Sequence, residues 1–516
     1  MTSRYRVEYA LKSHRRDEFI EWIKTLLACP FVLHADVESY NLAYPNLYEV
    51  PDDDKDSRFK QHEIDVAQDC QRRYLEIFKD VEQLINHTIL MDQLNDQQQK
   101  TLYPNPRYTL SRLRNLVPSI GRFFTKLPLS EAFLVEDERR GISKRRLVAP
   151  SFNDVRMILN MAQIMALTEI NRELGRTHLK LITFDGDVTL YEDGQSLVEG
   201  SDVVKRLVQL LAMGVYVGVV TAAGYPGQSG AVKYEERLKG LIDYLNREDG
   251  SCILTKEQKE NLLVMGAESN YLFRYNAQLK GLKFIDSEEW HLPQVQKWDN
   301  DKIKYIMHTC HHHLIHLQQK FQLEDTTTII KKERSVGIIP NPGQKILREQ
   351  LEEMVLSCSK KLEVILKSTD NTTTQTTQTS RSQASNDSTD EFTTSAGATT
   401  ATTSSFDPAS SSPLSDIKVC AFNGGSDVWV DIGDKALGVE SLQKYLCQDE
   451  SNDLCPIRKA ESLHIGDQFA LLGANDFKAR LSACTVWIAN PAETVAILDD
   501  ILEFVEKRKL DTTETK

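Results

Sequence analysis

The middle of the chain alternates between short apolar runs and amphipathic stretches. Apolar residues fill Leu179–Phe184 and Val215–Thr221, which predicts two buried strands, and the spacing over Asp202–Ala212 predicts a helix between them. Strands that alternate with helices along a chain indicate a parallel sheet. Two apolar segments nearer the C-terminal end, around 463–465 and 485–488, continue the same pattern. We therefore expect an α/β core that is built from two separated parts of the chain.

The N-terminal third follows a helical pattern instead. Apolar residues recur at helical spacing in 18–27 and 63–90, and Asn153-Asp154 offers a cap for a helix that extends to Leu167. No catalytic constellation accompanies these helices. The chain is therefore predicted to hold a helical regulatory or oligomerisation domain, a first part of the core, an inserted domain and a second part of the core. Their ranges are 1–175, 176–235, 236–430 and 431–516.

The inserted domain contains a strongly polar segment. Residues 369–413 are almost entirely Ser, Thr, Ala, Gln, Asn and Asp. Such a segment cannot bury enough apolar surface to offset the loss of chain entropy on folding. We predict a disordered loop, which is either a length-tolerant linker or a phosphorylation region.

Charge and cysteine usage restrict the classes of function. The formal net charge is -13 and the pI is about 5.5, so no global positive field favours nucleic acid or an anionic membrane. The nine cysteines form no CxxC pair, which indicates a reducing compartment. Residues 1–16 lack the apolar run of a signal peptide, and the longest apolar stretch, Leu207–Val220, is short for a membrane span. These features predict a soluble, cytoplasmic protein.

Two aspartates directly follow the first predicted strand of the core. Asp185 and Asp187 flank Gly186, and Mg²⁺ prefers one or two carboxylates together with phosphate oxygens. Asp185 can attack phosphorus to form an aspartyl-phosphate, and Asp187 can protonate the leaving oxygen and then deprotonate water. An isolated Asp-x-Asp is also found in turns and in Ca²⁺ sites, so the catalytic interpretation depends on what the other strand ends contribute.

Polar residues also follow other strands of the predicted core. Thr221 and the backbone after it, including Ala222, can bind phosphate, although Thr also caps strand ends. Lys435 lies before a helix and either balances the charge of carboxylates and phosphate or lies on the surface. Asp467 is the best third metal ligand, and Asp476 is either a partner behind it or a turn residue.

Two further clusters lie outside this set. His312 and His316 are one helical turn apart in a His/Cys-rich stretch, yet no carboxylate or thiol pair completes a closed zinc site, so a partly exposed helix is favoured. The basic stretch 139–146 is either a solvated or salt-bridged surface or a pocket for a polyanionic effector such as ATP. Lys144 is the candidate effector-binding residue.

The order of the core elements resembles one superfamily of phosphatases. Asp-x-Asp-x-Thr, then Thr, then Lys, then Gly-Asp followed by Asn-Asp is similar to the order in the haloacid dehalogenase superfamily. The resemblance implies a Rossmann-like, doubly wound parallel sheet core with an inserted α+β cap of the C2 type, here joined to a helical N-terminal domain. It also implies Mg²⁺ and an aspartyl-phosphate intermediate.

Longer segments resemble one family within that superfamily. Residues 184–194, 220–225 and 431–435 are similar to the IMP-specific 5′-nucleotidase family. The resemblance implies hydrolysis of inosine 5′-monophosphate (IMP) to inosine and phosphate. It further implies Mg²⁺ as cofactor, ATP as an allosteric activator and a homotetramer.

The resemblance also assigns roles by position. Asp185 would be the nucleophile and a metal ligand, Asp187 would be the acid and base with its backbone on the metal, and Asp467 would complete the metal site. Thr221 and Lys435 would hold the phosphate. The remaining candidates for substrate binding are Asp187, Ala222, Asp193, which could reach the ribose hydroxyls or the base, and Phe477, which either stacks on the purine or packs in the core.

Two alternatives stay open at this point. An enzyme of the same superfamily, a phosphatase or phosphomutase, could act on another nucleotide or on a sugar phosphate. A nucleotide-sensing scaffold with a decayed site is the non-enzymatic alternative, and the complete set of motif elements argues against it.

Overall fold

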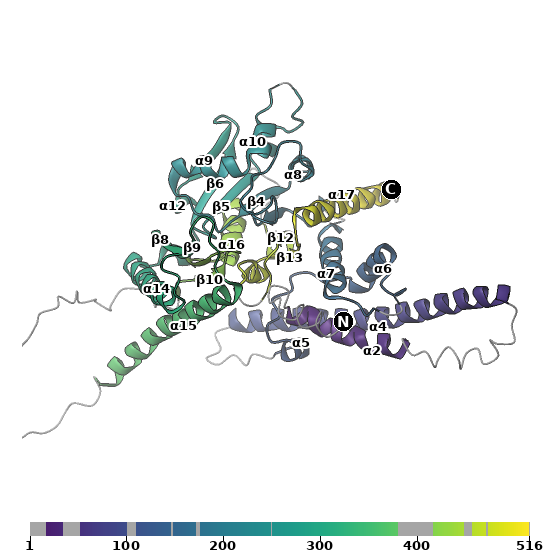
Figure 1. The fold of residues 1–516 in the computed structure, drawn as a ribbon. Coiled ribbons are helices and arrows are strands. Elements are labelled where there is room, and N and C mark those ends of the chain that lie inside the picture. The colour runs from purple at the N-terminus through teal and green to yellow at the C-terminus, as the bar shows by residue number, and fades with distance from the viewer. Residues whose placement is uncertain are drawn as a thin grey trace, which may run out of the picture. The chain divides into compact units, whose positions relative to one another are not determined.

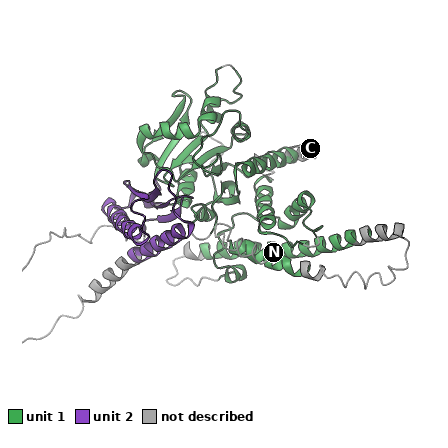
Figure 2. Ribbon diagram, in the orientation of Figure 1, with its two compact units in different colours: residues 1–290, 434–516 green, residues 291–433 purple. Residues whose placement is uncertain are grey.

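The computed structural model describes residues 17–34, 52–100, 110–145, 148–171, 176–248, 250–379, 416–447, 457–470 and 473–514. The chain divides into two compact units (Figure 2). Unit 1 comprises residues 1–290 and 434–516, and unit 2 comprises residues 291–433.

Unit 1 contains a seven-stranded sheet in the order β13-β12-β3-β4-β5-β6-β7 (Figure 1). The strands from β13 to β5 run parallel, and β6 and β7 add an antiparallel hairpin at one edge. The strands are β3 (Leu181–Phe184), β4 (Tyr216–Val220), β5 (Leu262–Gly266), β6 (Tyr271–Asn276), β7 (Gly281–Ile285), β12 (Ser462–Gly466) and β13 (Cys484–Trp487). This mixed α/β fold with a mainly parallel sheet confirms the predicted fold class at that level.

Both faces of the sheet are covered, because alternate residues of each strand enter different cores. Ile182 and Phe184 of β3 pack in one apolar cluster with residues of α8 and α17, whereas Leu181 packs in another with residues of α16. The helices around the sheet are α8 (Asp202–Ala212), α9 (Gly227–Arg237), α10 (Lys239–Leu245), α11 (Lys256–Lys259), α12 (Ser287–Trp290), α16 (Lys435–Leu446) and α17 (Pro491–Glu514). Two 3₁₀ helices, η4 (Lys459–Glu461) and η5 (Asp476–Leu481), flank β12.

The N-terminal helices of unit 1 form a core of their own, which also takes in Phe469 and Trp487. They are α2 (Glu18–His34), α4 (Asp52–Lys100), α5 (Arg112–Leu116), α6 (Leu129–Arg140) and α7 (Phe152–Leu167), followed by a short pair of strands, β1 (Ile170–Asn171) and β2 (Arg176–Thr177). The cap predicted at Asn153-Asp154 was placed too late. Ser151 caps α7 and Asp154 returns the bond to the Ser151 backbone, which is a reciprocal capping box.

Unit 2 is a four-stranded antiparallel sheet in the order β10-β11-β9-β8, with two long helices packed against it (Figure 2). Its elements are α13 (Pro293–Gln296), α14 (Asn300–Lys320), β8 (Thr327–Lys331), β9 (Ser335–Pro340), α15 (Arg348–Thr379), β10 (Val419–Asn423) and β11 (Val428–Ile432).

The structure places the start of the inserted part later than the sequence analysis did. We expected the insert to begin at residue 236, but β5, β6 and β7 belong to the sheet of unit 1, since the apolar run of β5 pairs in parallel with β4. The polar segment expected to be disordered from residue 369 begins inside α15, and residues 380–413 lie outside the described residues. None of the helices in the described part of the chain has the length and apolar character needed to span a bilayer.

Candidate active site

Asp185 lies at the carboxyl end of β3, where the chain leaves the sheet. Its backbone N–H still donates to the carbonyl of Ile465 on β12 at 2.9 Å, so the neighbouring strand fixes its position. The loop that follows is strained, because Val188 has a φ of 61° and a β-branched residue is rarely found there. Such strain is typical of functional loops that the surrounding structure holds in place.

Three carboxylates converge at this end of the sheet. Asp185, Asp467 and Asp476 each offer an oxygen that lies within 4.8 Å of those of the other two. Asp467 follows β12, the parallel neighbour of β3, so the sheet topology brings it beside Asp185. Burial raises the pKa of Asp185 to about 6, against the attraction of Lys435. Burial, and then the charges of Asp185 and Asp476, also raise the pKa of Asp467 well above its usual range.

Lys435 is the cation of this cluster. It is the first residue of α16, is fully buried, and places its Nζ 2.8 Å from Oδ1 of Asp185 and 2.6 Å from Oδ1 of Asp476. Burial alone would lower the pKa of Lys435, but the two carboxylates and Glu268 raise it, so the ammonium stays charged. Burial works against ionisation of Asp476 as well, yet Lys435 and His464 lower its pKa to about 2. The structure thus brings the predicted residues Asp185, Lys435 and Asp467 together.

Thr221 lies beside the same loop, at the end of β4. Its Oγ1 accepts a hydrogen bond from the backbone N–H of Ala223 at 3.2 Å, which leaves the hydroxyl proton to donate elsewhere. Gly186 explains how close the two segments come, because a Cβ there would lie 2.6 Å from the Tyr191 hydroxyl and 3.6 Å from Thr221 Oγ1. Ala222 follows directly and is half-buried.

The contacts that the structure shows for three other predicted residues do not involve the three carboxylates. Asp187 accepts a hydrogen bond from the backbone N–H of Gly194 at 3.0 Å, and Asp193 is exposed in that loop. Phe477 is half-buried, and the guanidinium of Arg480 lies 5.3 Å from the centre of its ring, which leaves both of its predicted roles open.

The basic stretch near Lys144 is largely paired. Arg139 forms two hydrogen bonds with Asp500, at 2.8 and 3.0 Å, and Arg145 pairs with Asp154 at 2.7 Å. Lys144 is exposed, and residue 146 lies outside the described residues. Pairing therefore accounts for the described arginines of this cluster as a salt-bridged surface, and Lys144 is an exposed lysine beside them.

The histidine-rich stretch forms the middle of α14 in unit 2. Nε2 of His308 lies 3.1 Å from Nε2 of His312, so one imidazole can donate to the other without a metal. His313 pairs with Ser357 of α15 at 2.9 Å, and Cys310 is buried on another side of the helix. Within the described residues, Asp185, Asp467 and Asp476 form the one group of three potential ligands that lie close enough to hold a metal ion.

Three residues of the site were missed or left undecided by the sequence analysis. Asp476 is not a turn residue but the buried partner of Lys435. Tyr191 is buried beside Gly186. Glu268 is fully buried in a strained turn after β5, with a φ of 62°, and accepts a hydrogen bond from the Asn475 side chain at 3.3 Å. Polar residues after the apolar run of β5 were the signal for Glu268, but that run had been assigned to the insert.

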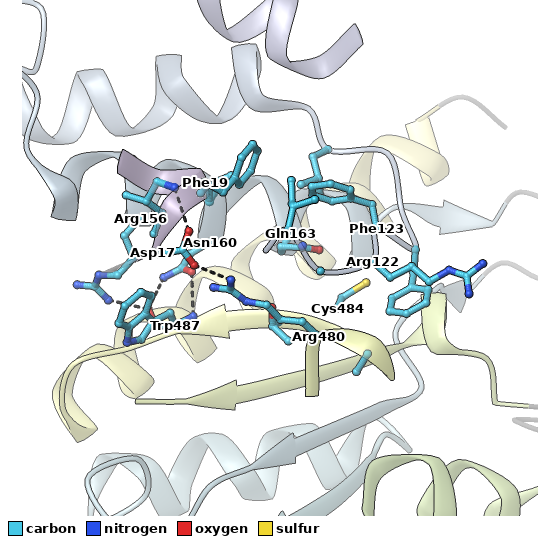
Figure 3. Close-up of a pocket in the computed structure, with 18 residues that line it drawn as sticks. Asp17, Phe19, Arg122, Phe123, Arg156, Asn160, Gln163, Arg480, Cys484 and Trp487 are labelled. Atoms are coloured by element: carbon cyan, nitrogen blue, oxygen red, sulfur yellow. Dashed lines mark hydrogen bonds and ion pairs between the residues drawn. The ribbon is translucent and has the colours of Figure 1, made fainter. Parts of the chain in front are cut away.

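A separate cavity of about 80 Å³ lies between the N-terminal helices and β13 (Figure 3). Trp487 lines this cavity, and its indole N–H donates to the backbone carbonyl of Asp467 at 2.7 Å. The side-chain amide of Asn160 pairs with both backbone groups of Trp487, at 2.8 and 3.0 Å. Arg480, which pairs with Asp17, lies on the same 3₁₀ helix as Asp476. The cavity therefore borders the 3₁₀ helix that carries Asp476 and the tryptophan that bonds the backbone of Asp467.

Comparisons with known proteins point to one family. A model of the IMP-specific 5′-nucleotidase family matches residues 1–498. Proteins from Candida albicans and Saccharomyces cerevisiae, both described as IMP-specific 5′-nucleotidase 1, are 63% and 42% identical to this chain, and each alignment covers 98% of this chain and 100% of the relative.

Solved structures of a Plasmodium falciparum IMP-nucleotidase are also similar. An IMP-bound mutant is 32% identical with a TM-score of 0.57, and the alignment covers 84% of this chain and 95% of that chain. An ATP-bound form is 31% identical with a TM-score of 0.55, over 90% of this chain and 92% of that chain. The chain belongs to the IMP-specific 5′-nucleotidase family, whose members are hydrolases of phosphate monoesters.

Proposed function

We propose that this chain hydrolyses IMP to inosine and phosphate through an aspartyl-phosphate on Asp185. The observation that carries the proposal is the buried contact of Lys435 with Asp185 beside Asp467, at the carboxyl ends of parallel strands. The names of the related proteins supply the substrate.

Two carboxylates divide the chemistry. A carboxylate oxygen of Asp185 attacks the phosphorus, the bond from phosphorus to the ribose 5′-oxygen breaks, and Asp187 gives that oxygen its proton. In the second step Asp187 takes a proton from water, the water oxygen attacks the phosphorus, and the bond to Asp185 breaks. Inosine leaves after the first step and phosphate after the second, which restores both aspartates.

Two other groups hold the transferred phosphoryl group. The hydroxyl of Thr221 has its proton available, because its oxygen already accepts from the backbone of Ala223. The ammonium of Lys435 is fixed between two buried carboxylates, so it is already in place to balance the negative charge that the phosphoryl group brings.

The carboxylate cluster fits Mg²⁺. Asp476 already accepts hydrogen bonds from Lys435, His464 and the backbone of Gln468, so Asp185 and Asp467 would hold the ion. Oδ1 of Asp467 is buried and accepts no hydrogen bond from the described residues. A cation there would also lower the pKa of Asp467, which burial and the neighbouring carboxylates raise. When bound, Mg²⁺ would supply positive charge next to the phosphate oxygens.

A substrate panel with and without Mg²⁺ tests the proposal. Release of phosphate from IMP should exceed release from other nucleoside monophosphates and from ribose 5-phosphate by at least about tenfold in kcat/KM. Removal of divalent cations with EDTA should lower the rate on the order of 10³-fold, and added Mg²⁺ should restore it. The Asp185→Asn protein, purified in parallel, controls for contaminating phosphatases.

A rate that is equal across the panel would assign the chain to a broader phosphatase activity. Mg²⁺ should also raise the melting temperature of the wild-type protein but not that of Asp467→Asn, since the ion binds the folded state only. Equal shifts in the two proteins would contradict the assignment of Asp467 as a ligand.

We further propose that ATP activates the enzyme through Lys144, and that the homotetramer implied by the family resemblance is the active assembly. Lys144 is an exposed lysine on a basic surface whose described arginines, at positions 139, 140 and 145, pair with carboxylates. Lys144→Ala should abolish most of the activation by ATP while the rate without ATP stays within about twofold. Lys205→Ala, at an exposed lysine of α8, is the matched control. Equal activation of both variants and the wild type would remove Lys144 from the effector site.

A further inference from the structure

A chain of buried polar side chains runs behind Lys435. Thr183 on β3 and His464 on β12 lie opposite each other in the register of the two parallel strands, and neither has an exposed side chain. Oγ1 of Thr183 lies 2.9 Å from Nδ1 of His464, and Nε2 of His464 lies 2.9 Å from Oδ1 of Asp476. The last group in this series of hydrogen bonds is the Lys435 ammonium, whose Nζ lies 2.6 Å from the same Asp476 oxygen.

These polar groups lie on the α16 side of the sheet, among apolar neighbours. Leu181 and Tyr216 of the sheet and Leu442 of α16 form the core on that side, and a Cβ added at Gly218 would lie 3.2 Å from Thr183 and 3.1 Å from Leu442. Burying a hydroxyl and an imidazole in such a place costs free energy unless both are hydrogen-bonded. The hydrogen bonds that link Thr183, His464 and Asp476 meet that condition with side chains alone.

Thr183 helps to determine which nitrogen of His464 carries the proton. Its hydroxyl has one proton and two acceptors within reach, Nδ1 of His464 at 2.9 Å and the carbonyl of Leu463 at 3.3 Å. Oδ1 of Asp476 accepts from Lys435 and is a carboxylate oxygen, so Nε2 of His464 carries a proton, and Nδ1 of the neutral ring accepts from the Thr183 hydroxyl. The hydroxyl thereby supports the tautomer that keeps its proton on Nε2. That N–H is directed at Asp476.

His464 thereby fixes the carboxylate of Asp476 from one side. Oδ1 accepts from both His464 and Lys435, and Oδ2 accepts from the backbone N–H of Gln468 at 2.9 Å. Gly466 allows this approach, since a Cβ there would collide with Oδ2 of Asp476. With both oxygens held, the carboxylate cannot rotate, and the Lys435 ammonium on Oδ1 stays next to Asp185.

We propose that His464, in the tautomer that Thr183 supports, is a positioning residue that acts through Asp476 to hold Lys435 at the phosphoryl-transfer site. The inference rests on the proposed function. His464 has no contact with the reacting atoms, so its effect falls on kcat rather than on the binding of IMP.

Two substitutions at His464 test this role. His464→Leu removes the N–H, and kcat for IMP should fall by about 100-fold while KM changes by less than about threefold, because a misplaced Lys435 weakens charge stabilisation during transfer. His464→Gln carries an amide N–H at about the place of Nε2, so it should recover kcat to within about tenfold of the wild type. If the leucine variant does not fold, the glutamine variant and the Thr183 pair decide the question.

Thr183→Val and Thr183→Ser test the tautomer. Valine removes the hydroxyl and should lower kcat by roughly fivefold, whereas serine keeps it and should restore kcat. In the His464→Gln background there is no imidazole tautomer to set, so Thr183→Val should have no further effect on kcat. Additive losses in the double variant would contradict a shared route through His464.

Ser462→Ala is the matched control for the loss of a buried, hydrogen-bonded side chain. Ser462 lies two residues before His464 on β12 and bonds Gln443 at 2.9 Å, not Asp476. It should lower the melting temperature without changing kcat. The inference is overturned if His464→Gln and His464→Leu both lower the melting temperature and leave kcat within about twofold of the wild type. Failure of the proposed function is a different result, namely no hydrolysis of IMP by the wild-type chain.

Discussion

Asp185→Asn is expected to abolish phosphate release from IMP, with kcat lowered on the order of 10⁴-fold or more. The amide has the shape of the carboxylate but cannot supply the nucleophilic oxygen that forms the aspartyl-phosphate. Lys435 keeps its second carboxylate partner, Asp476, so no buried cation is left alone. The variant therefore tests the chemistry with little disturbance of the site around it.

The same variant should fold at least as well as the wild type at neutral pH. Burial raises the pKa of Asp185 to about 6, so the ionised side chain is less stable in the folded chain than in the unfolded one. An acid with a raised pKa destabilises the fold above that pKa and not below its unfolded value, so the cost is present at pH 7.5. Asparagine removes this cost, and the melting temperature should stay equal or rise.

Covalent labelling of the protein gives an independent measurement. Turnover of IMP that carries a labelled phosphate is stopped with acid, and the label bound to the protein is counted. Label should remain covalently attached to the wild-type chain and be absent from Asp185→Asn. Asp243→Asn, at an exposed aspartate of α10 that pairs with Lys239, is the matched control and should behave like the wild type. A variant at Asp185 that releases phosphate at a near-normal rate would rule out the aspartyl-phosphate.

The sequence alone was sufficient to predict that the residues after the core strands lie at one edge of the sheet. Asp185, Thr221 and Asp467 were expected there because an apolar run predicts a strand and the carboxyl ends of parallel strands share an edge, and the structure places them there. The mainly parallel α/β core was predictable for the same reason. The catalytic and binding roles of these three residues stay predictions. Lys435 followed from its place before a helix, together with the order of the other elements.

The residues behind the site were not identified in this way: His464 and Glu268 were missed, and Asp476 was left as either a partner of Asp467 or a turn residue. Asp476, His464 and Glu268 are buried by packing between segments far apart in the chain, and no local spacing encodes such contacts. His464 in particular lies in the middle of an apolar strand, where its period-2 position indicates burial but not a partner. The boundary at residue 236 failed because a strand that extends a sheet looks locally like a strand of an inserted domain.

Hydrogen bonds link the N-terminal helices to the site, and no sequence motif predicts this link. Asn160 of α7 pairs with the backbone of Trp487 on β13, and the Trp487 indole holds the carbonyl of Asp467. The edge strand of the sheet is therefore closed by a side-chain amide from the helical region, instead of by another strand. Hydrogen bonds therefore connect α7 to the backbone of a proposed metal ligand through one tryptophan.

Lys435→Met is expected to lower both the activity and the stability of the protein. Methionine has a similar length but no charge, so the buried carboxylates of Asp185 and Asp476 lose their common cation. Breaking a buried ion pair by removing one partner costs about 3–5 kcal/mol, and we expect the free energy of unfolding of unit 1 to fall by that amount at pH 7.5. Loss of the fixed positive charge should lower kcat on the order of 10³-fold.

Acid pH should narrow the stability difference between Lys435→Met and the wild type. Without the ammonium, the pKa values of Asp185 and Asp476 rise, since Lys435 lowers both in the intact site. An acid whose pKa is higher in the folded than in the unfolded chain binds more protons when folded, so the free energy of unfolding increases as the pH falls through that range. Urea unfolding at pH 7.5 and pH 5.5 should therefore show a smaller deficit at the lower pH.

A second lysine variant distinguishes the loss of a buried cation from the general effect of replacing a lysine. Lys459→Met removes a half-buried lysine that pairs with Glu440, and it should cost no more than about 1 kcal/mol, with kcat unchanged. Lys435→Met combined with Asp476→Asn should regain part of the lost stability, because one uncompensated carboxylate is gone, but none of the lost activity. Stability recovered together with activity would mean that Lys435 serves the fold alone. A deficit that does not change with pH would mean that the carboxylates next to Lys435 do not carry the charge assigned to them.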